Sequence, residues 1–294
     1  MQNSLAYAAA LATILIWGLA VIPVKHATTS GRLGLAFSLP AGLFGLTLAA
    51  LCLGVRLPGW SELGTVTGLV LVAVGVCEFP AATLAYYEAV RRSELSVAVP
   101  LTRMKVVFVA VLALLLGIET VTPRLMLACA VGTLGAVILS RSRPVTPRPT
   151  AAPLNRGALL ALLAAFFWAV GDVLSPVAMR RLDPLPLTLL ALLAGTIVYY
   201  GYLLAAGQVT AAFRIPRRDK LLFCGHGLFS FGLAYYTFYY AILRLGVTRT
   251  AVITASWPLV SFAVGLAFYR ERVTAAKCCG IVLIAASIVM ALGR

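Results

Sequence analysis

Charged residues are scarce in this chain. They make up 11% of its 294 residues, and only 9 residues are Asp or Glu. A soluble domain usually has about 25% charged residues, so this shortage excludes a chain made mainly of water-soluble domains. Hydrophobic residues account for 62% of the sequence instead. The composition predicts a protein that crosses a lipid bilayer several times.

Motifs for several other functions are also missing from the sequence. It has no Walker A motif, HExxH motif, zinc-ligand spacing, acidic metal cluster or aromatic–basic RNA motif. The adjacent Cys278 and Cys279 form neither a CxxC motif nor a disulfide framework. We therefore expect no cofactor, no metal, no catalytic residues and no nucleic acid partner. The net charge of +15 comes mostly from short segments between apolar runs, which is typical of membrane topology.

Ten apolar runs follow one another, and most are long enough to span a hydrocarbon core with about 20 helical residues. Only helices or closed barrels satisfy the backbone in lipid, and these runs are too long and too uniformly apolar for barrel strands. The first run lacks the positive start of a signal peptide, so we expect a retained helix. The runs are 5–25, 33–53, 64–88, 95–117, 124–140, 156–178, 185–206, 220–243, 247–269 and 274–292.

A Pro- and Arg-rich linker at 141–155 separates residues 1–140 from residues 156–294, with five runs on each side. The two halves are related by an offset of 152 positions, which pairs Tyr87 with Tyr239 and Glu119 with Glu271. An odd number of helices in each half forces the halves into opposite orientations. The sequence therefore predicts an inverted repeat, a frequent transporter design with its site between the halves.

Several short motifs recur in order along the chain. They are "WG" followed by Lys25, "YYEAV" and "FYYAIL", "ASWPL", "GIE" and "YRER". In these motifs the chain resembles the EamA-like ten-helix proteins of the drug/metabolite transporter (DMT) superfamily. The resemblance implies an all-α integral membrane protein with about ten transmembrane helices in two inverted five-helix repeats. It also implies transport of a small metabolite by alternating access at a central cavity.

Five ionisable residues lie well inside apolar runs: Glu78, Arg103, Lys105, Asp172 and His226. A cation at the bilayer centre costs about 2.5–3.5 kcal/mol on insertion scales, so we interpret each residue as a candidate for substrate binding or coupling. The alternative for Glu78 and Arg103 is an ion pair that only holds two helices together.

Arg103 and Lys105 are two residues apart, which is about 200° around a helix, so they cannot share one face. We expect Arg103 to face the cavity with Glu78 as its resting partner. A second alternative is that the helix begins near Pro100 and that the two cations lie close to its start.

Aromatic residues near these positions are further candidates for substrate binding. Trp168 lies four residues before Asp172 and shares its helix face. Trp17, Trp257, Tyr87 and Tyr239 also lie within the apolar runs. Packing or a structural role in the repeat is the alternative for each of them.

Asp172, Glu78 and His226 are also candidates for coupling. Glu119 and Glu271 each end an apolar run, and we interpret them as gate or loop ion pairs with Arg124 and Arg272.

We predict a secondary transporter of a small polar metabolite, either an amino acid or another organic anion or zwitterion. We expect it to export this substrate. A proton or counter-substrate would drive transport. The alternative is a lipid-carrier-handling protein, either a flippase-like subunit or a membrane enzyme acting on an anionic lipid. We expect a multi-pass protein of the bacterial inner (plasma) membrane. The sequence leaves monomer and homodimer open.

The distribution of Lys and Arg predicts how the chain is oriented in the membrane. Alternate loops on one side hold 15 of these residues and those on the other side hold 7, with Arg103 and Lys105 left out as intramembrane. The positive-inside rule then places the linker in the cytoplasm and both chain ends outside. An enzymatic reporter that works only outside the cytoplasm should be active when fused to the C-terminus. Activity of a cytoplasm-only reporter at that position would contradict this orientation.

Overall fold

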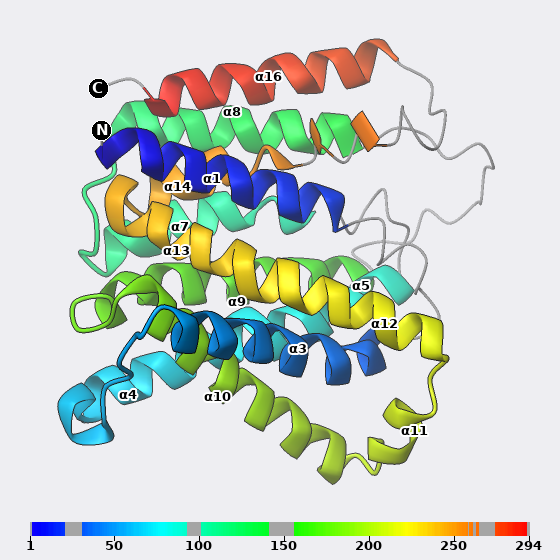
Figure 1. Ribbon diagram of the computed structural model, residues 1–294. Helices are drawn as coiled ribbons and strands as arrows, with labels where there is room; N and C mark the ends of the chain where they lie inside the picture. The colour runs from blue at the N-terminus through cyan, green and yellow to red at the C-terminus, as the bar shows by residue number, and fades with distance from the viewer. Residues whose placement is uncertain are drawn as a thin grey trace.

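The computed structural model describes residues 2–20, 31–92, 101–140, 156–257, 259–260, 263–264 and 274–292. Every element in these ranges is a helix, which confirms the predicted all-α fold (Figure 1). In the first half the helices are α1 (Gln2–Leu19), α3 (Gly31–Cys52), α4 (Trp60–Val76), η1 (Cys77–Ala81), α5 (Ala82–Arg92), α7 (Lys105–Leu115) and α8 (Pro123–Ser140). In the second half they are α9 (Arg156–Ala178), α10 (Pro184–Ala205), α11 (Val209–Phe213), α12 (Arg217–His226), η2 (Gly227–Leu233), α13 (Ala234–Leu245), α14 (Val247–Thr254) and α16 (Ala275–Leu292).

The helices have the length and composition of membrane spans. Five helical stretches are long and apolar enough to cross a bilayer: Gly31–Cys52, Leu63–Ala89, Arg156–Ala178, Pro184–Ala205 and Arg217–Leu245. Shorter apolar helices cover Ser4–Leu19, Lys105–Leu115, Pro123–Ile138 and Cys278–Leu292. Large side chains such as Phe44, Leu51 and Leu69 are exposed on the outside of the bundle. An apolar outer surface of this kind suits contact with lipid.

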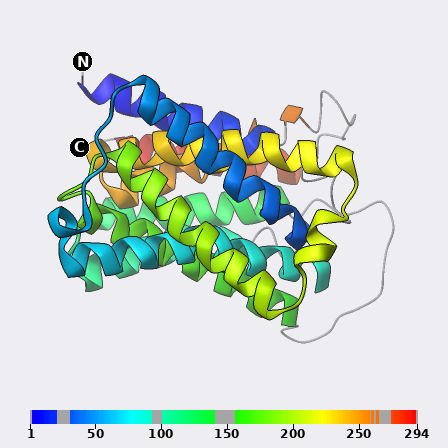
Figure 2. The same cartoon turned by 60° about the horizontal axis from the view of Figure 1, so that its bottom comes forward.

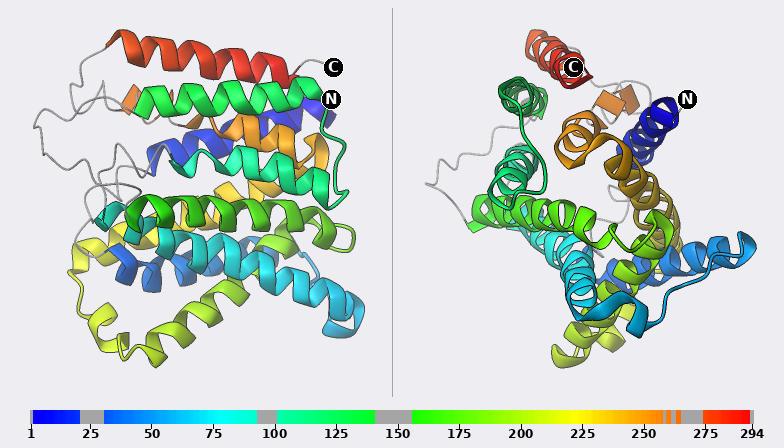
Figure 3. Two further views of the ribbon diagram at one scale, coloured as in Figure 1. Left: turned by 180° about the vertical axis from the view of Figure 1, so that it is seen from behind. Right: turned by 90° about the vertical axis from the view of Figure 1, so that its left-hand side faces the viewer.

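The two halves run in opposite directions through the bundle. In Figure 1, α1 leaves the side of the N-terminus, whereas α9 ends on that side. Helices α8 and α16 end their respective halves and pack side by side at one edge of the bundle, again in opposite directions (Figure 3). On the opposite side, α10 packs against both α3 and α4 (Figure 2). The opposite directions of α1 and α9, and of α8 and α16, agree with the predicted inverted repeat.

Two π-helical turns occur at equivalent places in the halves, η1 in the first and η2 in the second. The N–H of Ala82 bonds to the Cys77 carbonyl and so bypasses the carbonyl of Glu78. The N–H of Ala234 likewise bonds to the Phe229 carbonyl and bypasses that of Ser230. Pro80 lies inside η1 and has no N–H to donate, which favours an irregular turn there.

A tryptophan from the opposite half satisfies each bypassed carbonyl. Trp168 Nε1 on α9 donates to the Glu78 carbonyl at 3.2 Å. Trp17 Nε1 on α1 donates to the Ser230 carbonyl at 3.3 Å. Glu78 and Ser230 are 152 positions apart, as the repeat requires. An unpaired carbonyl inside a membrane protein costs several kcal/mol, so the two indoles stabilise the π-helical turns and join the halves.

The apolar run predicted at 95–117 is not one continuous helix. Leu101 and Thr102 are helical, Arg103 and Met104 form a turn, and α7 begins at Lys105. In this turn the N–H of Met104 bonds three residues back to Leu101, and that of Val106 bonds to Arg103. The expectation of a helix that carries both cations was therefore wrong, and the alternative of a later start is closer to the structure.

The second half has the same break. Ala255 and Ser256 form a turn directly after α14, and they occupy the repeat positions of Arg103 and Met104. The interruption therefore belongs to the repeat and not to the two cations. Interrupted helices of this kind line the central sites of many transporters with inverted repeats.

Replacement of Trp168 or Trp17 by Phe tests the indole hydrogen bonds. Either change keeps an aromatic ring but leaves a buried carbonyl without its donor, so each should lower the free energy of unfolding by about 1–3 kcal/mol. Denaturant unfolding of the purified protein in detergent measures this loss. Equal stability of both variants and the wild type would show that the indole N–H groups do not hold the π-helical turns.

Candidate functional site

A buried ion pair connects the two halves at the centre of the bundle. Lys105 at the start of α7 places its Nζ 2.9 Å from Oδ2 of Asp172 on α9. The Asp172 side chain is 0% exposed and that of Lys105 is 17% exposed. The turn at Arg103 and Met104 directs α7 so that its first residue reaches α9. Since charges are costly in hydrocarbon, this pair is a candidate functional feature.

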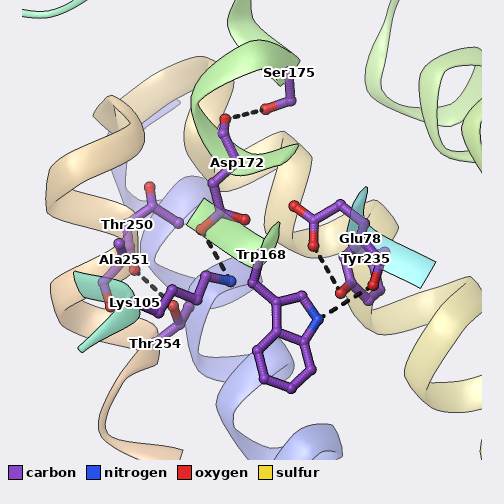
Figure 4. Close-up of polar contacts among 9 residues, drawn as sticks. All are labelled: Glu78, Lys105, Trp168, Asp172, Ser175, Tyr235, Thr250, Ala251 and Thr254. Carbon is purple, nitrogen blue, oxygen red and sulfur yellow. Dashed lines mark hydrogen bonds and ion pairs between the residues drawn. The ribbon is translucent and has the colours of Figure 1, made fainter. Parts of the chain in front are cut away.

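Glu78 is the third charged member of this cluster. It lies in η1, is 0% exposed, and its Oε2 accepts a hydrogen bond from the Tyr235 hydroxyl at 3.0 Å. Gly171 lets it approach α9, because a Cβ at Gly171 would lie 2.6 Å from Glu78 Oε1. The carboxyl groups of Glu78 and Asp172 therefore face each other across the cluster (Figure 4).

Aromatic rings enclose the Lys105 ammonium. Its Nζ lies 5.1 Å from the ring centre of Phe238 and 5.7 Å from that of Trp17. The Trp17 ring also packs against Tyr235, with 5.4 Å between centroids. Rings at these distances attract a cation and exclude water. Tyr239 on α13 is buried in the same wall, and its hydroxyl has no hydrogen-bond partner among the described residues.

Arg103 does not pair with Glu78, which corrects the pairing expected from the sequence. Its guanidinium lies 4.2 Å from the ring centre of Trp257, and its Nη2 donates to Thr102 Oγ1 at 3.2 Å. Asp172 is instead the ionic partner of Lys105, the cation that the sequence analysis ranked second. Arg103 is half-buried, and its Nε has no hydrogen-bond partner within the described ranges, so it can still bind an anionic group.

Two other residues predicted from the sequence, Tyr87 and His226, pack against aromatic rings. Tyr87 is partly buried, and its ring packs against that of Tyr86 at 6.0 Å. His226 packs against Phe231 at 5.0 Å between ring centroids, and its Nδ1 has no hydrogen-bond partner among the described residues. The described contacts of His226 do not include the charged cluster.

Glu119 contacts the other half of the molecule. Its Oε2 accepts a hydrogen bond from the backbone N–H of Thr248 at 3.0 Å, so the carboxylate caps the start of α14. Gly246, with φ of 88°, lies against the same carboxylate. Glu119 thus acts as a helix cap between the halves, and its expected ion pair with Arg124 stays a prediction. Glu271 lies outside the described residues.

A pocket of about 270 Å³ lies one helical turn from the cluster, between the ends of α9 and α13. Its lining includes Pro176, four residues after Asp172, and Ile242, three residues after Tyr239. Glu119 and Arg180 also line it. The ends of α9 and α13 point to the side where both chain termini lie (Figure 1). The pocket therefore lies on that side of the cluster.

Two residues of the cluster were not singled out from the sequence. Tyr235 and Phe238 belong to the aromatic run "FSFGLAYYTFYYAI". The density of rings in that run was a signal for a cavity wall, but it did not say which rings turn inward. Tyr235 and Phe238 follow Phe231 by four and seven residues. Only the structure shows that these rings pack together beside the charged cluster.

The fold and the buried charges define an all-α integral membrane protein that crosses the bilayer several times. Within it, residues 155–293 match the family described as the EamA-like transporter family. For the second half of the chain, this match confirms the resemblance that the sequence motifs indicated.

Two further proteins are similar to this chain. An "Uncharacterized transporter" of Archaeoglobus fulgidus is 26% identical over 219 residues, which cover 74% of this chain and 75% of the relative. A protein of known crystal structure covers 99% of both chains with a TM-score of 0.77 and 18% identity. At that identity the second likeness shows the fold alone. The family match and the relative from Archaeoglobus fulgidus support a membrane transporter in general terms.

Replacement of Lys105 by Met tests the ion pair. It removes one partner and leaves the buried Asp172 carboxylate without its ammonium, which should lower the free energy of unfolding by about 3–5 kcal/mol. Arg103→Met is the matched control, since Arg103 has no carboxylate partner among the described salt bridges, and it should cost less. Denaturant unfolding in detergent measures both losses. A larger loss for the Arg103 variant would contradict the assigned pairing.

Proposed function

We propose that this protein is a secondary transporter that exports a small polar metabolite, an amino acid or another organic anion or zwitterion. The observation that carries the proposal is the buried Glu78–Lys105–Asp172 cluster. Two of its members come from the first half and one from the second. A site built from both halves changes when the halves move against each other, as alternating access requires.

The chemistry around the cluster supports a polar substrate of small size. Both signs of charge are present, and the side chains of Trp17, Phe238 and Tyr239 provide apolar walls. The Nε of Arg103, beside Trp257, has no partner in the part of the chain that the structure describes, and it suits a carboxylate. A substrate amine would be placed near Glu78 and Asp172, with its acidic group toward Lys105 or Arg103.

The EamA-like match and the transporter from Archaeoglobus fulgidus favour transport over catalysis. The sequence has no Walker A motif, so a gradient of a proton or a counter-substrate would supply the driving force. We place the protein in the inner (plasma) membrane of a bacterium. With the chain ends outside, as the loop charges favour, the pocket beside Glu119 opens to the exterior.

A comparison of two glutamates tests the site. Glu78→Gln removes a charge from the cluster and should abolish transport of labelled solute in liposomes. Glu88→Gln is the matched control, because Glu88 is ten positions further along and bridges Arg91 and Arg92 at the end of α5. Exposed pairs of this kind contribute about 0–1 kcal/mol, so transport should persist.

The substrate is found first by a thermal-shift screen of the purified protein against small metabolites, because a bound ligand raises the apparent melting temperature. Normal transport by the Glu78 variant, or transport loss by both variants alike, would overturn the assignment of the site. Chemical conversion of the solute would show an enzyme instead of a transporter.

A further inference from the structure

The central cluster has an unequal number of opposite charges. It contains two carboxyl groups, Glu78 and Asp172, and one ammonium group, Lys105. With all three groups ionised, its net charge is negative by one unit. Glu78 and Asp172 are 0% exposed, so water cannot compensate that charge well. A buried charge without a counter-charge is unfavourable, and the cluster therefore needs one more positive charge.

The surroundings do not supply this charge within the described part of the chain. Tyr235 and Tyr239 from α13 lie near the carboxyl groups, and Trp17 from α1 packs against Tyr235; none of the three carries a positive charge. Cys77 in η1 lies beside Glu78 and is also not a cation. The Lys105 ammonium pairs with Asp172 and also attracts the Glu78 carboxylate.

Arg103, a half-buried cation of this region, is engaged elsewhere. It stacks on Trp257 and donates to Thr102, and no salt bridge in the described part of the chain joins it to Glu78 or Asp172. His226 packs against Phe231. The two carboxyl groups therefore compete for the single ammonium of Lys105.

The contacts of the carboxyl groups leave room for another donor. Glu78 Oε1 and Asp172 Oδ1 have no hydrogen-bond partner among the described residues, and the same holds for the Tyr239 hydroxyl. All three side chains are fully buried, and the carboxyl groups of Glu78 and Asp172 face each other (Figure 4). Two carboxyl groups that face each other can form a hydrogen bond only when one of them carries a proton.

We propose that Glu78 and Asp172 share one exchangeable proton, and that a ligand with one net positive charge binds by displacing it. A primary ammonium ligand then places its N–H groups on both carboxylates, and the proton leaves to solvent. A zwitterion brings no net charge, so it binds without displacing the proton, with its carboxylate on Lys105. This inference rests on the site assigned in the proposed function, but it concerns proton occupancy and not movement across the membrane.

Lys105 determines that the cluster takes up one further positive charge and not two. Its ammonium already neutralises one carboxylate, and the Trp17 and Phe238 rings hold it in place. Without Lys105, both carboxyl groups would need a proton or a cation. The lysine therefore sets the number of exchangeable positive charges at one.

Infrared titration of the purified full-length protein in detergent tests the proton directly. The wild type should show one protonated carboxyl band at neutral pH that fades at alkaline pH. Glu78→Gln and Asp172→Asn should each lose the band, because the remaining carboxylate is then balanced by Lys105. Lys105→Met should approximately double the band, and Glu88→Gln should leave it unchanged. Absence of the band in folded wild type, or its persistence in both neutral variants, would overturn the proposal.

A matched pair of probes tests the displacement. n-Butylammonium has one positive charge, and γ-aminobutyrate has the same four carbons with a carboxylate in place of the terminal methyl group. Titration with n-butylammonium at constant pH should abolish the wild-type band and release one proton per protein. γ-Aminobutyrate should leave the band intact. Failure of n-butylammonium to reduce the band at any concentration that keeps the protein folded would overturn the exchange, and equal loss with both probes would overturn its dependence on charge.

Liposome transport by the same preparation separates the two proposals. Transport of solute by a protein that lacks the band would support the proposed function and contradict this inference. The band and the exchange in a protein that transports nothing would support this inference and contradict the proposed function.

Discussion

The cost of burying charge in a membrane is the constraint on which the centre of this structure depends. Lys105, Asp172 and Glu78 lie inside the bundle, and each lowers the cost of the others by pairing or by hydrogen bonding. Their pairing requires α7, α9 and η1 to meet at one place. Because these helices come from both halves of the chain, the charges also fix how the halves fit together.

Irregular backbone surrounds these charges. The π-helical turns η1 and η2 and the interruptions at Arg103 and Ala255 occur in pairs related by the repeat. Each π-helical turn frees a carbonyl, and an indole from the opposite half binds it. Irregular backbone in a membrane protein is tolerated where protein groups satisfy it. The same contacts that satisfy the backbone therefore hold the two halves in register around the polar cluster.

Much of the site was predictable because ionisable residues are so rare inside the apolar runs. Glu78, Lys105 and Asp172 were all found in this way, since only a functional or paired charge persists in hydrocarbon. Their pairing was predicted wrongly. A continuous helix was assumed through Arg103, and the turn at Arg103 and Met104 changes the direction in which each cation points. Tyr235, the donor to Glu78, was hidden among many similar rings.

The sequence by itself determined the membrane class, the number of apolar runs and the inverted repeat. These properties follow from the composition and from the spacing of residues along the chain, and hydrocarbon admits few other structures for such runs. The tertiary structure alone decided which carboxylate binds which cation and which aromatic rings enclose them. Those contacts join residues far apart in the sequence, such as Lys105 with Asp172 and Glu78 with Tyr235. They depend on helix interruptions and close helix approaches whose geometry no local pattern specifies.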